Sequence, residues 1–186
     1  MLRAPCVGAY HFIEDLTVQL LIVWHSRTEA SQQLAFFAAQ GAQDVIEKLG
    51  LKASCSVHCL PAMAVTTTDL LQAAAYLFCA PENLGSLSGE IKAFFDVHYY
   101  AVLEQLNGRP YSALISAGSA GHGAAQQIET ICTGWRLQLV HPITIFNFGA
   151  QTPAEIAAPK SLTFTMTQQA KEIGGLLAAH LALQIN

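Results

Sequence analysis

Charged residues are scarce in this chain of 186 residues. They make up only 12% of the sequence, about half the usual share, whereas 52% of the residues are apolar. So few charges favour a parallel sheet that is covered on both faces, a surface that is buried between subunits, or both. We expect both, with a homo-oligomer that is a dimer or a tetramer.

Basic residues are fewer than acidic ones. Nine lysines and arginines against 13 acids give a formal net charge of −4, so the basic surface typical of nucleic-acid binding is missing. Long apolar runs are also missing, since the run 18–24 is far shorter than the roughly 20 residues that a membrane helix needs. A single Arg3 followed by Glu14 and Asp15 does not resemble a secretory signal. We therefore expect no nucleic-acid partner, no membrane insertion and a cytoplasmic location.

The number of cysteines is odd, which favours reduced thiols over a disulfide framework. Cys55 and Cys59 flank His58, but residues four apart on a strand are about 13 Å from each other, too far to share one metal ion. The other histidines show no metal spacing, and none has a serine or cysteine partner that can be argued from the sequence. We expect neither a metal site nor a catalytic acid, base or nucleophile.

Strand-like and helix-like segments alternate along the chain. Apolar runs predict strands at 18–24, 51–60, 76–80, 111–116 and 140–148. Helical spacing predicts helices between residue 34 and Gly50, from Ser88 to Asn107, after Gly123, and over 162–183, with a short helix capped by Asp69. The side chains expected to be buried by the Ser88 helix are Ile91, Phe94, Phe95, Tyr99, Val102 and Leu106.

This alternation indicates a parallel, doubly wound α/β sheet. Residues 1–16 show no periodicity and are interpreted as an N-terminal extension, with a single domain over 17–186. Right-handed crossovers place every strand-to-helix loop at one edge of the sheet, which is where open α/β folds bind ligands. Three polar loops therefore form the candidate site.

The first loop, 26–31, contains three hydroxyls beside a helix start, which would suit a phosphate group. Ordinary helix capping by Thr28 or Ser31 explains the same residues, and on composition alone it is the favoured reading. The third loop, 116–123, is rich in glycine and ends beside His122, which is more readily explained as an exposed loop residue than as a catalytic one.

The second loop follows the strand 76–80. Proline lacks the N–H that a sheet ladder needs, so Pro81 is expected to end the strand. Gly85 and Gly89 allow a sharp turn or a close approach to a flat ligand. Glu82 and Asn83 could be ordinary surface residues.

Together the three loops resemble the flavodoxin-like family of FMN-binding proteins, in particular the NAD(P)H-dependent FMN reductases and quinone oxidoreductases. The resemblance covers residues 17–186 and is most specific in APENLGSLSGEIKAFFD, 80–96, which matches the family pattern of Pro, loop residues, Gly, Ser or Asn, and then Lys-x-Phe-x-Asp. HSRTEAS matches the family's phosphate loop in part, and SAGSAGHGAAQQIE matches the third flavin loop.

The resemblance implies a flavodoxin-like three-layer sandwich with a five-stranded parallel sheet in the order 2-1-3-4-5 and helices on both faces. It implies FMN along the carboxyl edge, with the phosphate held by Ser26, Arg27, Thr28, Ala30 and Ser31. The residues that it places on one side of the flavin ring are Pro81, Glu82, Asn83, Leu84, Gly85 and Ser86. Those that it places on the other side are Ser116, Ala117, Gly118, Ser119 and Gly121.

The activity implied is a cytoplasmic flavoprotein oxidoreductase that takes hydride from NAD(P)H and passes electrons to a quinone, a flavin or another small acceptor. Glu29 departs from the family, which usually has Gly there, and Ser31 stands where the family has Thr. A carboxylate about 7 Å from a phosphate would cost on the order of 2 kcal/mol per unit charge at a dielectric near 20. Glu29 therefore leaves open a family member that has lost FMN and acts as a binding or structural protein. A flavodoxin-type electron carrier, with no nicotinamide reaction of its own, is a second alternative.

Overall fold

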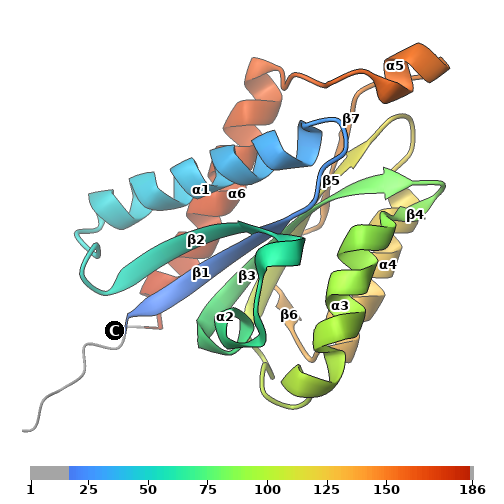
Figure 1. Ribbon diagram of the computed structural model, residues 1–186. Helices are drawn as coiled ribbons and strands as arrows, with labels where there is room; N and C mark the ends of the chain where they lie inside the picture. Colours follow the sequence, from blue (N-terminus) through green and yellow to red (C-terminus); the bar gives the residue numbers. More distant parts are fainter. Residues whose placement is uncertain (1–16, 185–186) are drawn as a thin grey trace, which may run out of the picture.

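The computed structural model describes residues 17–184, so the predicted N-terminal extension lies outside the described residues. Its parallel sheet consists of β2 (Cys55–Pro61), β1 (Val18–Trp24), β3 (Ala73–Asn83) and β5 (Pro110–Ala117), in that spatial order, followed by β6 (Gln138–Leu139). β7 (Thr144–Asn147) also pairs with β5, and the short β4 (Ser86–Leu87) pairs with β3 in the antiparallel direction. Figure 1 shows helices on both sides of this sheet.

The predicted strand order 2-1-3-4-5 is confirmed, with one difference in the last strand. The sequence predicts an unbroken strand at 140–148, whereas the structure has two pieces, β6 and β7, that pair with the two ends of β5. Pro142 lies in the gap and has no N–H to donate to a ladder. A side-chain hydrogen bond replaces the ladder here: the Ser112 hydroxyl of β5 donates to the carbonyl oxygen of His141 at 3.1 Å.

The helices form two layers. α1 (Ala30–Lys48) and α6 (Phe164–Ala182) cover one face of the sheet, and α3 (Gly89–Val102) and α4 (His122–Gly134) cover the other (Figure 1). α2 (Thr67–Gln72) follows the single turn η1 (Ala62–Ala64), and α5 (Pro153–Ala157) lies beyond the ends of the strands. No helix within residues 17–184 is long and apolar enough to cross a bilayer.

Alternate residues of each central strand face opposite layers, as the two-residue period of a strand requires. Leu20 and Ile22 of β1 pack toward α1 and α6, whereas Leu21 and Val23 pack toward α3. Both sets are fully buried, and for this reason the sequence of β1 is apolar at every position except Gln19.

The α1–α6 layer depends on glycines. A Cβ at Gly41 would overlap the carbonyl oxygen of Lys171, and a Cβ at Gly174 would overlap that of Ala38. The two helices therefore touch backbone to backbone, which larger side chains would not allow. This contact fixes the middle of α1 against α6.

Three local predictions need correction. Tyr99 is 39% exposed, because it points away from the aromatic layer that buries Phe94 and Phe95. α3 ends at Val102 and not at Asn107-Gly108. Asp69 is the third residue of α2 and not its cap; the cap is Thr66, which forms a reciprocal capping box with Asp69.

Candidate functional site

The three predicted loops meet at the carboxyl edge of the sheet. They follow β1, β3 and β5, which are neighbours in the order β2-β1-β3-β5. The order reverses between β1 and β3, because β2 lies on the other side of β1. At such a reversal, open α/β sheets bind their ligands beyond the carboxyl ends of the strands.

The first loop turns sharply at Glu29. This residue is the N-cap of α1 and has φ 65° and ψ −13°, a left-handed conformation that favours glycine. Its side chain is exposed and makes no capping hydrogen bond. The first N–H groups of a helix have no intrahelical acceptor, and among the described residues none is found for those of Ala30, Ser31 and Gln32. The backbone thus keeps the shape that a glycine would give, and the helix start remains available to an anion.

A buried hydrogen bond joins the first loop to the third. The hydroxyls of Ser31 and Ser116 are 2.8 Å apart, and Ser31 is fully buried. The structure therefore places the Ser31 side chain against β5 and not in the lining of the cavity, so its N–H is the group of this residue that stays available to a ligand.

The second loop is a β-hairpin and not an irregular loop. Contrary to the sequence-based expectation, Pro81 does not end its strand: β3 pairs with β5 as far as Pro81 and Ser116, and continues to Asn83. The carbonyl oxygen of Pro81 accepts a hydrogen bond from the Ser88 N–H at 3.2 Å. Since a proline still supplies a carbonyl acceptor, a ladder can continue past it where the missing N–H is not needed.

The hairpin turn consists of Leu84 and Gly85, both with positive φ (51° and 74°), as in the mirror-image turns that suit hairpins. Leu84 is fully exposed at the tip. Behind the turn, a Cβ at Gly123 would overlap the Gly85 carbonyl oxygen, so α4 begins directly against the hairpin.

The Glu82 carboxylate connects the hairpin to the third loop. Its Oε2 atom accepts the Gly121 N–H at 2.7 Å. Gly121 has φ 93° and lies against the side chain of Ile145, which leaves no room for a Cβ. The positive φ of Gly121 and its close contact with Ile145 together fix the position of the third loop relative to β7.

An ion cluster ties the first loop to α3. Arg27 donates to Glu90 Oε1 at 2.5 Å, and His25 Nε2 lies 3.4 Å from Glu90 Oε2. Burial lowers the pKa of His25 below its usual 6.5, an effect that Glu90 opposes and Arg27 reinforces. The pKa of Glu90 is also lowered, first by a hydrogen bond from its own backbone N–H and then by the two cations.

A cavity of about 330 Å³ lies between the loops. The predicted site residues that line it are Arg27, Thr28, Ala30, Pro81, Glu82, Asn83, Ser116, Ala117 and Gly118. The predicted residues that do not line it are Ser26, Ser31, Leu84, Gly85, Ser86, Ser119 and Gly121. Four of these residues shape the turns around the cavity, Ser31 through its bond to Ser116 and Leu84, Gly85 and Gly121 through their positive φ.

Sequence reasoning missed the fourth side of the cavity. It is lined by Phe148, Ala150, Ile156, Ala157 and Lys160, from the connection between β7 and α6. One signal was present: Thr152, Pro153 and Glu155 form a capping box with proline at the first helical position, which is typical of a helix start. α5 is not among the helices predicted from the sequence.

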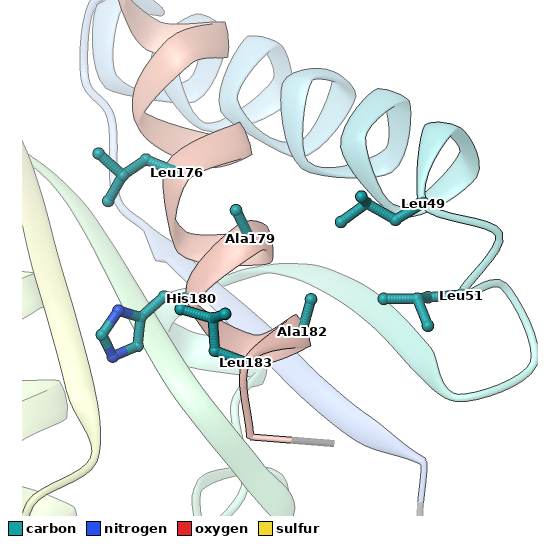
Figure 2. A pocket seen from close by; sticks show the side chains of 7 residues that line it. All are labelled: Leu49, Leu51, Leu176, Ala179, His180, Ala182 and Leu183. Carbon is teal, nitrogen blue, oxygen red and sulfur yellow. The ribbon is translucent and has the colours of Figure 1, made fainter. Parts of the chain in front are cut away.

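A larger cavity, about 600 Å³, lies at the opposite end of α1 and α6. Figure 2 shows that the side chains around it are mostly aliphatic, with His180 as the polar exception. His180 is the one polar side chain among the residues that line it, so this lining lacks the set of several donors that surrounds a bound phosphate. Within residues 17–184 no group of three His, Cys, Asp or Glu residues could hold a metal ion.

A family model described as NADPH-dependent FMN reductase matches residues 37–151, more than half of the chain. This chain belongs to that family. The match includes the second and third loops of the FMN reductase fold seen here, and it starts inside α1, after the first loop.

Solved structures share the fold of this FMN reductase family member at low sequence identity. A flavodoxin from the domain Archaea is 16% identical with a TM-score of 0.68, covering 89% of this chain and 99% of its own. A WrbA-like flavodoxin from Agrobacterium tumefaciens is 14% identical with a TM-score of 0.67, covering 90% and 99%. The Flv1 flavodiiron core from Synechocystis sp. PCC6803 is 13% identical with a TM-score of 0.69, covering 91% of this chain and 37% of its own. No curated protein matches the sequence.

We predict that Glu29→Gly raises the free energy of unfolding by about 1 kcal/mol, because glycine adopts the left-handed conformation without the cost that a Cβ imposes. Glu29→Ala removes the same carboxylate but keeps the Cβ, so it should give no gain. Urea unfolding of both variants separates the two causes. An equal gain from Ala and Gly would show that charge, and not backbone strain, is responsible.

We predict that His25 titrates below pH 6.5, because it is partly buried, and that Glu90→Gln lowers its pKa further by removing the opposing carboxylate. NMR titration of the His25 ring protons measures both values. A His25 pKa at or above 6.5, or one that rises in Glu90→Gln, would contradict this description of the cluster.

Proposed function

We propose that this protein binds FMN in the carboxyl-edge cavity and oxidises NAD(P)H, passing the electrons to a quinone, a flavin or another small acceptor. The observation that carries the proposal is the start of α1. There a left-handed Glu29 leaves backbone N–H groups without acceptors, beside a cavity lined by Arg27 and Thr28. Family membership supports the same conclusion.

The donors present fit a phosphate monoester. Helix N–H groups, a hydroxyl and a guanidinium are the groups that bind phosphate in proteins, and the helix dipole adds a partial positive charge. Glu29 opposes this with a carboxylate, but its side chain is exposed and water screens its charge. This exposure argues against the alternative in which the chain has lost FMN.

The remaining walls fit a flat ring. Pro81, Glu82 and Asn83 form one side of the cavity, and Ser116, Ala117 and Gly118 form part of the other. Gly118 has no side chain to fill the space, and the nearest atom to a Cβ there would be the Ala150 carbonyl oxygen at 3.4 Å. A slot with one backbone wall suits the close approach of an aromatic ring system.

FMN, when bound, supplies the redox chemistry by accepting hydride from a nicotinamide and releasing electrons to the acceptor. The protein's own residues would bind the phosphate and line the two sides of the ring, with Phe148 and Ile156 adding apolar contact at one end of the cavity. The Glu82–Gly121 hydrogen bond keeps the hairpin and the third loop in register.

We also propose a homo-oligomer in the cytoplasm. Val97 and Tyr100 on the outer side of α3 are 75% and 81% exposed, and Tyr99 and Leu103 continue the same apolar surface. Exposed apolar groups of this kind are typical of subunit contacts. The described cysteines are all unpaired, which suits a reducing compartment.

We predict that the purified protein mixed with FMN shows a perturbed flavin spectrum and oxidises NADPH or NADH when a quinone is added. Gly118→Leu should weaken FMN at least tenfold, because its side chain would enter the slot, whereas Gly134→Leu, at the end of α4, should not. Tight FMN binding without nicotinamide oxidation would favour an electron carrier. No flavin binding at millimolar FMN would reject both functions.

A further inference from the structure

Backbone hydrogen bonds join the connection between β7 and α6 to the first and third loops. The N–H groups of Phe148 and Ala150 donate to the carbonyl oxygens of Ala117 and Gly118, both at 2.9 Å. Further on, the Lys160 N–H donates to the Thr28 carbonyl oxygen at 2.8 Å.

Gln33 of α1 strengthens the second attachment. Its Nε2 atom donates to the Lys160 carbonyl oxygen at 2.6 Å, and its Oε1 atom lies 3.4 Å from the N–H of Leu162. The backbone of Lys160 is therefore fixed on both sides, by Thr28 of the first loop and by the first turn of α1. Lys160 also lines the same cavity as Thr28 and Ala30, the residues at the start of α1.

The ammonium group of Lys160 is also held in place. Nζ donates to the carbonyl oxygens of Glu155, Ile156 and Ala158, at the carboxyl end of α5. The bond to Ile156 is the longest, at 3.3 Å, and is the easiest to exchange for another acceptor. Because a fixed side chain loses little rotamer freedom on binding, its charge acts on a ligand at low entropic cost.

Among residues 17–184 no carboxylate lies within salt-bridge distance of Lys160, although Glu155 is near enough for the lysine to help lower its pKa. The carboxylate of Glu155 instead accepts the N–H groups of Gln151 and Thr152 through Oε2. Arg27, the other cation of the cavity, differs in both respects, since it is 58% exposed and is paired with Glu90. Lys160 is thus the less compensated of the two positive charges that line the cavity.

We propose that Lys160 is a phosphate-binding residue of the FMN site, and that it offsets the negative charge that Glu29 brings to the first loop. This inference rests on the proposed function and extends it to a residue outside the three loops. The ligand group that Lys160 recognises is the phosphate monoester, not the flavin ring.

Riboflavin separates these two parts of the ligand, because it has the ring of FMN without the phosphate. We predict that Lys160→Gln weakens FMN at least tenfold at low ionic strength and leaves the riboflavin dissociation constant unchanged. Lys160→Arg keeps the charge and should recover most of the FMN affinity. Fluorescence quenching of each flavin gives the constants.

Lys52→Gln is the matched control, since it removes one positive charge from an exposed lysine in the connection between α1 and β2. It should change neither affinity. Equal FMN affinities for wild type and Lys160→Gln would overturn the inference and leave the proposed function intact. A parallel loss of FMN and riboflavin would show that Lys160 only holds the connection in place, which also overturns it. Wild-type protein that binds neither flavin would reject the inference and the proposed function together.

Discussion

The left-handed turn at Glu29 is the constraint on which the site depends. A helix that leaves a parallel strand must reverse direction within a few residues, and here the reversal takes five residues after Trp24. The positive φ of Glu29 turns the first N–H groups of α1 toward the sheet edge. A non-glycine residue pays conformational strain in this region, and such strain is typically retained at functional sites. The exposed side chain of Glu29 is tolerated because the function of this position lies in its backbone.

The rest of the molecule keeps that turn in place. α1 is pressed against α6 through Gly41 and Gly174, so its axis has little freedom to move. The Ser31–Ser116 hydrogen bond attaches its first turn to β5, and the connection through Lys160 attaches the loop before it to α6. The second and third loops are attached to each other by Glu82 and Gly121. The cavity is therefore bounded by four segments that are far apart in the sequence. Hydrogen bonds connect each of these segments to at least one other.

Much of this could be predicted from the sequence. The apolar run 18–24 gave β1 with its observed bounds, and the alternation of strands and helices gave the parallel sheet, because burial on both faces leaves a plain signal. The order of the strands came from resemblance and not from the pattern. The prediction that Pro81 ends its strand was wrong. A proline ends a strand only where a neighbouring strand needs the N–H that proline lacks. Lys160 was overlooked because its position comes from tertiary contacts with Thr28 and Gln33, which no local pattern records. α5 was overlooked although Thr152, Pro153 and Glu155 carry a local signal for a helix start.

The central claim is that FMN binds at the carboxyl edge with its phosphate at the start of α1. Amide NMR spectra recorded during titration with FMN, and then with riboflavin, test it most directly. The account predicts that FMN shifts the amides of 28–32, 82–86 and 117–121, and that riboflavin shifts the last two groups but leaves the first nearly unchanged. Shifts that gather instead around Leu49, Leu51 and Leu183, at the apolar cavity of Figure 2, would contradict it.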